Sequence, residues 1–282
     1  MDINGKTLAK KLREKIKKEI LELKKRFNKV PKLVVILIGD YAPSKIYVQN
    51  KKKAAEEVGI ISEILDYKSD VTEKEILEKI HKLNLDKNID GILVQLPLPS
   101  QISNEKIINL IDPQKDVDGF NPYNVGRLSS GYKGIVPCTP LGCLMLIKEI
   151  EKKLIGKHVV IIGRSNLNGK PMAQLMLQEH CTVTIVHSKT NNIKEECLKA
   201  DILIAAAGVP KLVKADWVKK NCIVIDVGIN KLGGKIIGDT DYENIKNQAK
   251  AITPVPGGVG PMTIACLLKN TLECFKKSNY TK

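Results

Sequence analysis

The chain has 282 residues, of which 43% are hydrophobic and 27% charged. This length suits one large domain or two modest ones, and the composition excludes a disordered chain, a collagen and a disulfide miniprotein. The net charge of +15 raises the question of a polyanionic partner, but only four of the 46 basic residues are arginines and the lysines are scattered. We therefore expect a solvated, lysine-rich surface and no nucleic-acid partner.

The cysteines and the uncharged segments bear on the cellular compartment. The seven cysteines contain no C-x-x-C pair, and several lie in apolar runs, as reduced, buried thiols do. Residues 251–268 carry no charge, but prolines and glycines interrupt them, so we expect a loop running into a helix and no membrane span. The N-terminus lacks an apolar signal core. These features favour the cytoplasm.

The first half of the chain alternates predicted strands with predicted helices. Apolar residues at helical spacing predict a helix over 6–27, and a second helix over 44–58 has Ser44 as its expected N-cap and Gly59 at its end. Thr72 and Glu75 form a capping box that opens a third helix. Strands are expected at 33–38, 60–66 and 91–95. The order βαβαβ predicts a parallel sheet.

The second half repeats this alternation after a helix near 104–111 and a passage, 112–140, that is rich in Gly, Pro, Asn and Asp. A structureless passage of that length usually serves a site or joins domains. After a helix at 141–153, strands are expected at 158–162, 182–186, 201–205 and 222–226, with helices near 170–179, 191–199 and 215–220. A hairpin around Gly233-Gly234 and a helix over 261–276 complete a two-domain, doubly wound α/β fold.

A glycine turn after the strand at 158–162 suggests a nucleotide site. Gly163-Arg164-Ser165 leads into a helix start, where unpaired amides suit a pyrophosphate. Ser165 replaces the middle glycine of the strict dinucleotide fingerprint, so an ordinary strand-helix turn is the alternative. The next strand ends in His187-Ser188-Lys189 without the acid that binds an unphosphorylated ribose, which, with Arg164, favours NADP over NAD. Alternatively, His187 and Ser188 only cap the following segment.

Four polar residues point to chemistry. Tyr47 and Lys51 are four apart and share a helix face, where a phenol can tune an amine that acts as a general acid or base, although such pairs are common on solvated helices. Gln95 ends a strand, where ligands of open sheets collect, or it is simply a polar strand end. Asp118, in Asp116-Val117-Asp118-Gly119, could bind a cationic or amidine-like group of an organic substrate. No histidine or further carboxylate cluster lies near it, so we expect no metal.

Together these residues resemble the bifunctional methylenetetrahydrofolate dehydrogenase/methenyltetrahydrofolate cyclohydrolase family over nearly the whole chain. The matching segments are Tyr47-Val48-x-x-Lys51-x-Lys53, Val94 to Pro99, Lys115 to Gly119, Pro137 to Pro140, Gly163 to Asn166, Asp226 to Asn230 and Thr253 to Thr263. The resemblance implies a catalytic, folate-binding domain at 1–138, completed by the C-terminal helix at 262–282. It also implies a Rossmann-like NADP domain at 139–261, an active site in the cleft between the domains, and a homodimer.

The resemblance also implies roles for single residues. Lys51 would transfer the proton of the cyclohydrolase step, tuned by Tyr47 and Gln95; Tyr47 would also stack on the folate, and Asp118 would hold the pterin. Further substrate contacts would come from Pro256 and Gly260. The nucleotide site would be lined by Gly163, Arg164, Ser165, Ser188, Ile229 and Thr263. Asn168 departs from the apolar residue usual at its place. The rival hypotheses are another NADP-dependent dehydrogenase acting on a small acid and a lysine-rich nucleic-acid binder.

Overall fold

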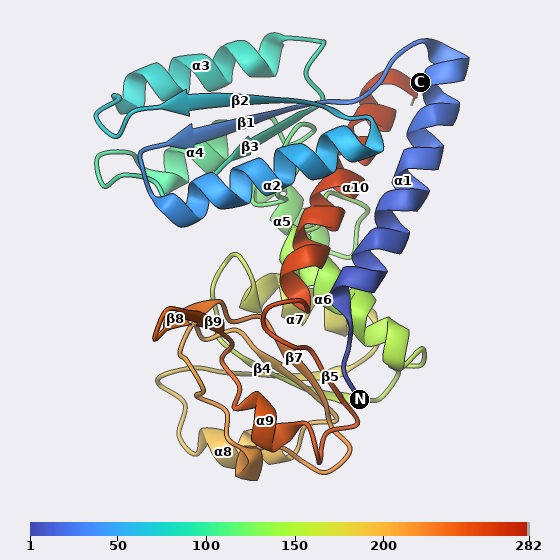
Figure 1. Ribbon diagram of the computed structural model, residues 1–282, viewed down its shortest axis with the longest axis vertical. Helices are drawn as coiled ribbons and strands as arrows, with labels where there is room; N and C mark the ends of the chain where they lie inside the picture. The colour runs from blue at the N-terminus through green and yellow to red at the C-terminus, as the bar shows by residue number, and fades with distance from the viewer. Residues whose placement is uncertain (281–282) are drawn as a thin grey trace. The chain divides into compact units, whose positions relative to one another are not determined.

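The computed structural model describes residues 1–280 (Figure 1). The chain divides into two compact units. One, the three-stranded unit, comprises residues 11–127, 133–136 and those from 267 onward. The other, the five-stranded unit, comprises residues 1–10, 128–132 and 137–266.

The three-stranded unit is an α/β layer structure built on the parallel sheet β2-β1-β3. The helices and strands that lie wholly or largely in it are α1 (Gly5–Phe27), β1 (Lys32–Ile38), α2 (Ala42–Val58), β2 (Ile61–Tyr67), α3 (Glu73–Leu85), β3 (Gly91–Val94), α4 (Asn104–Leu110), α5 (Pro122–Ser129) and the C-terminal part of α10 (Val259–Tyr280). Figure 1 shows α2 and α3 on opposite sides of the sheet. The central strand β1 is apolar and almost wholly buried, because helices cover both of its faces.

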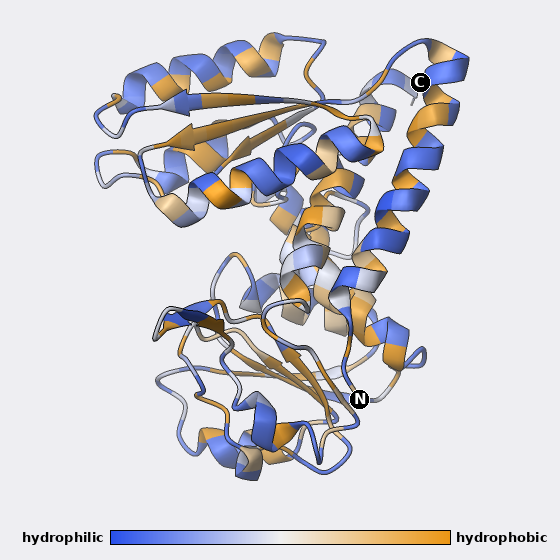
Figure 2. Cartoon of the chain, viewed as in Figure 1, coloured by the Kyte–Doolittle hydropathy of each residue, from blue (hydrophilic) through white to orange (hydrophobic). Residues whose placement is uncertain are grey.

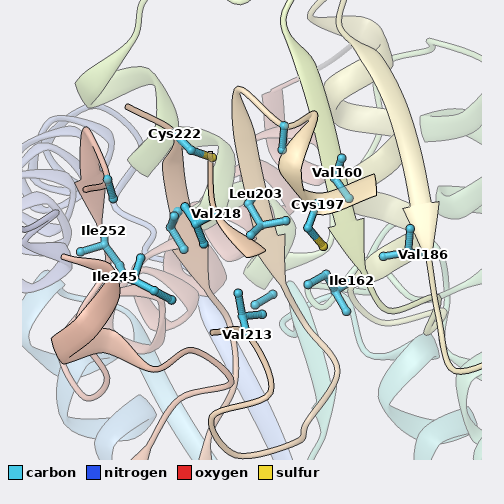
Figure 3. Packing of buried hydrophobic residues seen from close by; sticks show 14 residues of the cluster. Val160, Ile162, Val186, Cys197, Leu203, Val213, Val218, Cys222, Ile245 and Ile252 are labelled. Atoms are coloured by element: carbon cyan, nitrogen blue, oxygen red, sulfur yellow. The ribbon is translucent and has the colours of Figure 1, made fainter. Parts of the chain in front are cut away.

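The five-stranded unit contains the parallel sheet β10-β7-β6-β4-β5 and a small antiparallel hairpin. Its elements are α6 (Cys138–Ile150), β4 (His158–Ile162), α7 (Gly169–Gln178), β5 (Thr182–Val186), α8 (Ile193–Leu198), β6 (Ile202–Ala205), the 3-10 turn η1 (Ala215–Trp217), β7 (Ile223–Asp226), β8 (Asn230–Leu232), β9 (Lys235–Ile237), α9 (Tyr242–Ile245) and β10 (Ala251–Ile252). Figure 3 shows part of its core, where side chains from the sheet pack against α8 and the segment after β6.

Hydropathy explains why these segments became strands and helices. The inner strands are coloured mainly as hydrophobic, whereas the edge strand β2 and the surface helices alternate between hydrophilic and hydrophobic residues (Figure 2). A strand covered on both faces needs an unbroken apolar run, and a helix covered on one side needs an apolar stripe. The α/β fold class and the parallel sheets predicted from the sequence are therefore confirmed.

The structure corrects several predicted elements. Ser44 is not an N-cap: α2 begins at Ala42, after Tyr41, and Ser44 is buried inside the helix. The passage at 112–140 is not structureless, because it contains α5 and the start of α6. The short elements α9 and β10 were not predicted. By contrast, the capping box of Thr72 and Glu75 and the hairpin turn at Gly233-Gly234 are present as predicted.

Three further observations concern the residues that the structure describes. All seven cysteines are buried thiols. None of the helices within residues 1–280 combines the length and the apolar character that crossing a bilayer requires. In the same residues, no group of three or more His, Cys, Asp or Glu side chains is placed to hold a metal ion.

Candidate active site

The amine of Lys51 is held by the amide of Gln95. Lys51 lies on α2 and Gln95 follows the last residue of β3, and Lys51 Nζ donates a hydrogen bond of 2.9 Å to Gln95 Oε1. Gln95 Nε2 donates to the carbonyl oxygen of Leu96 at 2.7 Å, which fixes the orientation of the amide. These residues are far apart in sequence and meet because β3 pairs with β1, the strand that leads into α2. Both side chains are half-buried.

Tyr47 lies one turn before Lys51 on the same helix and is also half-buried. Burial raises the pKa of its phenol above the ordinary value, so Tyr47 is neutral near neutral pH. The Lys51 amine donates to Gln95 rather than to the phenol. Tyr47 therefore contributes a flat, partly accessible ring beside the amine, which suits stacking on a planar ligand.

Asp118 lies close enough to Lys51 for the two charges to interact. Burial raises the pKa of the Asp118 carboxyl to about 6, the nearby Lys51 charge opposes the rise, and Asp116 adds to it. The backbone explains the proximity. Ile92 of β3 pairs in parallel with Asp116 and donates to the Lys115 carbonyl at 2.8 Å, so the chain then runs toward the end of β3, where Gln95 lies. The structure thus gathers Tyr47, Lys51, Gln95 and Asp118 in the three-stranded unit.

The residues before Asp118 hold its loop in place. The amine of Lys115 donates to three carbonyl oxygens at the end of α3, those of Leu83, Asn84 and Asp86, at 2.7 to 2.9 Å. The buried carboxylate of Asp116 accepts from the backbone of Gly119 and Asn121 and from the side chain of Asn124, at 2.8 to 3.0 Å. These anchoring roles were missed in the sequence, where Asp116 and Asp118 look alike. Among the described residues, backbone groups donate hydrogen bonds to the carboxylate of Asp116 but not to that of Asp118.

The glycine turn of the five-stranded unit forms a cradle at the end of β4. Gly163 has φ +125°, and a Cβ there would overlap the carbonyl oxygen of Ala206, so only glycine fits. Ser165 Oγ accepts from Asn168 N at 3.1 Å, just before α7 begins at Gly169. Arg164 and Ser165 are exposed. A tight glycine turn, an open basic side chain and the start of a ten-residue helix fit the phosphates of a dinucleotide.

The other predicted nucleotide and substrate contacts also lie in the five-stranded unit. Ser188 is exposed after β5, in a turn where Lys189 N donates to His187 Nδ1 at 3.2 Å, so His187 does cap this turn. Ile229 follows β7 and is 53% exposed as a residue. Thr263, in the second turn of α10, shares a 3.0 Å hydrogen bond with Thr139 of α6. Pro256 is exposed, and a Cβ on Gly260 would meet no atom within 4 Å.

Comparisons with known proteins decide the family. Residues 3–118 match the model for the catalytic domain of tetrahydrofolate dehydrogenase/cyclohydrolase, and residues 137–279 match the model for its NAD(P)-binding domain. The chain belongs to the tetrahydrofolate dehydrogenase/cyclohydrolase family. It is 63% identical to the bifunctional protein FolD of Pelagibacter ubique over 98% of each chain.

Two solved structures of this family have the same fold. The bifunctional enzyme FolD of Campylobacter jejuni superposes with a TM-score of 0.96 at 46% identity, covering 98% of this chain and 99% of that one. The FolD of Trypanosoma brucei, described as complexed with NADP cofactor and inhibitor, superposes with a TM-score of 0.95 at 36% identity, covering 100% and 99%.

Proposed function

We propose that this chain is a bifunctional one-carbon enzyme. It oxidises 5,10-methylenetetrahydrofolate to 5,10-methenyltetrahydrofolate with NADP and then hydrolyses the methenyl compound to 10-formyltetrahydrofolate. The observation that carries the proposal is the Lys51 amine, held by Gln95 and adjacent to Asp118, in a chain that belongs to the tetrahydrofolate dehydrogenase/cyclohydrolase family.

The oxidation demands positioning more than acid-base chemistry. NADP, when bound, accepts the hydride that leaves the bridging methylene of the folate. The methenyl cation that remains is stabilised by resonance between two nitrogens, so no protein base is needed in this step. The chain's contribution is to orient the folate: Asp118 accepts from the amidine-like edge of the pterin and Tyr47 stacks on its ring, with further contacts from Pro256 and Gly260.

The hydrolysis needs a proton to move. Water adds to the cationic methenyl carbon, loses a proton, and the ring then opens on one nitrogen, which must gain a proton. The Lys51 amine gives and takes this proton at Nζ, while the Gln95 oxygen keeps the amine in place. Asp118 lies near Lys51 and has a pKa of about 6, so it is ionised at neutral pH. Its negative charge attracts the cationic substrate.

The remaining assignments complete the proposal. The nucleotide is bound by Gly163, Arg164, Ser165, Ser188, Ile229 and Thr263. Residues 1–138 with 262–282 form the folate-binding domain, of which 281–282 lie outside the described residues, and 139–261 form the NADP domain. The protein works as a homodimer in the cytoplasm, with a folate as its substrate and without a nucleic-acid or membrane partner. The exposed Arg164 and the absence of an acid after β5 support the choice of NADP.

Replacement of Lys51 by Met tests the function. We expect hydrolysis of methenyltetrahydrofolate, followed by its absorbance, to fall by at least about 100-fold, because general acid-base catalysis contributes that much. Reduction of NADP with methylenetetrahydrofolate should persist, since the oxidation needs no base. Lys52→Met is the matched control: Lys52 is the next residue on α2 and pairs with Glu56 at 3.9 Å.

Two results would contradict the proposal. Hydrolysis by Lys51→Met at the rate of the unaltered chain would remove Lys51 from the mechanism. Failure of the unaltered chain to reduce NADP with methylenetetrahydrofolate would reject the dehydrogenase activity itself.

A further inference from the structure

A single buried carboxylate connects two loops at the carboxyl ends of β6 and β7. Asp239 is fully buried, and its Oδ2 accepts from the backbone nitrogens of Ala207 and Gly208 at 2.7 and 2.8 Å. Its Oδ1 accepts from the side-chain nitrogen of Asn230 at 2.8 Å. Ala207 and Gly208 follow β6, whereas Asn230 is the first residue of β8, directly after the turn that follows β7. All of these residues lie in the five-stranded unit.

Asp239 is itself held by a second buried carboxylate. Its backbone nitrogen donates to Asp226 Oδ1 at 2.9 Å, and the same oxygen accepts from Gly228 N at 3.0 Å. The backbones approach so closely that a Cβ on Gly228 would overlap the Asp239 carboxylate. Asp226 also accepts from the backbone and hydroxyl of Thr240, at 2.8 and 2.6 Å. The position of Asp239 is therefore fixed by β7 and by Val213, whose backbone nitrogen donates to the Asp239 carbonyl oxygen at 3.0 Å.

Both loops border the glycine turn or carry a predicted nucleotide contact. Ala206, just before the two amides that Asp239 binds, is the residue whose carbonyl packs against Gly163. Ile229, just before Asn230, is an apolar residue that is 53% exposed. In open α/β sheets, ligands bind beyond the carboxyl ends of the strands, and these loops lie at those ends.

We propose that Asp239 is a positioning residue of the nucleotide site: its carboxylate sets the distance between the loop after β6 and the turn after β7, and so holds the surface that receives NADP. This inference rests on the proposed function, because that function names NADP as the ligand. Asp239 does not touch the nucleotide, being fully buried. Without the Asp239 carboxylate, the distance between the two loops varies. A ligand that binds at only one of these distances then binds less tightly, because only part of the population is competent to bind it.

The test compares NADP binding between variants by calorimetry, which does not depend on turnover. Asp239→Ala removes all three hydrogen bonds, and we expect the Kd for NADP to rise by about tenfold or more, the effect expected when charge-assisted hydrogen bonds that order a site are lost. The KM for NADP should rise in parallel. The rate of methenyltetrahydrofolate hydrolysis without NADP should stay within about twofold of that of the unaltered chain.

A second pair of variants covers the case in which Asp239→Ala does not fold. Asn230→Asp places two carboxylates against each other and should also weaken NADP binding. The double variant Asn230→Asp/Asp239→Asn restores one donor and one acceptor with their positions exchanged, and should regain most of the affinity. Recovery through exchange shows that the contact itself matters, not the stability of the fold in general.

Asp201→Ala is the matched control. Asp201 precedes β6 at its other end, where its carboxylate accepts from His158 N at 3.0 Å and from the Lys219 amine at 2.8 Å. Its loss should lower stability without changing the Kd for NADP. The inference is overturned if Asp239→Ala binds NADP like the unaltered chain, if it loses NADP binding and hydrolysis equally, or if the double variant is no better than Asn230→Asp. Failure of the unaltered chain to bind NADP would instead reject the proposed cofactor.

Discussion

Asp116 and Asp118 are two residues apart and do different work. The Asp116 carboxylate accepts from backbone donors of its own loop and from a side-chain donor on α5. Asp118 has the Lys51 charge nearby and a pKa of about 6. A carboxyl that ionises near neutral pH, in a site without enough donors of its own, is poised to accept from a ligand.

The pKa of Asp118 predicts opposite effects of Asp118→Asn on stability and on binding. Because the folded-state pKa is raised above the unfolded value of 3.8, the carboxyl stabilises the fold at low pH, and this contribution is lost as the pH rises through about 6. Above pH 6, the free energy of unfolding of Asp118→Asn, measured in urea, should therefore exceed that of the unaltered chain by about 1 to 3 kcal/mol. This difference should vanish toward pH 4.

The same substitution should raise the KM for methylenetetrahydrofolate at neutral pH. In the unaltered chain this KM should rise as the pH falls below about 6, because the protonated carboxyl no longer accepts from the pterin. The exposed Asp70 provides the control, since Asp70→Asn should change neither quantity. A variant whose stability difference is constant from about pH 4 to about pH 8 would argue against a raised Asp118 pKa.

At single residues, the sequence predicted the groups that carry out the chemistry better than the hydrogen bonds that hold those groups in place. The resemblance to a known family named Lys51 and Gln95, but the hydrogen bond between them depends on strand pairing that no spacing reveals. Asp239 was not singled out, because a buried carboxylate that binds backbone amides has no sequence signature. Sequence patterns identify groups that face a ligand more readily than groups that face the chain's own backbone.

At the scale of elements, α10 anchors two irregular segments through one buried side chain. Asn270, near its middle, is buried, and its side-chain nitrogen donates to the carbonyl oxygens of Val117 at 2.9 Å and Val136 at 2.8 Å. Val117 directly precedes Asp118. The helix therefore holds two irregular segments of the three-stranded unit, one of which carries a predicted substrate contact.

Asn270→Ala should lower both stability and folate binding. It leaves one buried and one part-buried carbonyl oxygen without this donor, which should cost about 1 to 3 kcal/mol in the free energy of unfolding, measured in urea. The KM for methylenetetrahydrofolate should rise because the Asp118 loop is no longer tied to α10. Lys269→Ala, one residue earlier on the same helix, should have little effect. An Asn270→Ala protein as stable as the unaltered chain would show that these two hydrogen bonds carry no net stability.

The accuracy of the predicted elements follows the clarity of their patterns. β4 was predicted with its observed bounds because an apolar run lies between polar turns. By contrast, α5 was missed because its sequence, which includes Pro122, Asn124 and Gly126, reads as a loop. β10 has only two residues, too few for any periodicity, and exists because the edge of β7 accepts it. These elements depend on tertiary contacts, so local sequence propensity does not predict them.

At the scale of the whole molecule, the basic surface is broken up by carboxylates. The net charge is +15. However, many lysines lie beside acids, as Lys106 does beside Glu73 at 2.6 Å and Lys250 beside Glu151 at 3.0 Å. Such exposed pairs add little stability, but they interrupt the positive field that a polyanion would follow.

This arrangement predicts weak binding of nucleic acid with a shallow dependence on salt. A protein that neutralises many phosphates loses affinity steeply as salt rises, with a slope set by the number of phosphate contacts. We expect a duplex DNA to bind this chain with a Kd above about 10 μM near physiological salt, and with a logarithmic slope no steeper than about −3. Fluorescence anisotropy of a labelled duplex across a salt series measures both quantities. NADP added to the complex shows whether the two ligands share a site. Nanomolar affinity with a steep slope, unaffected by NADP, would mean that the charge serves a polyanionic partner after all.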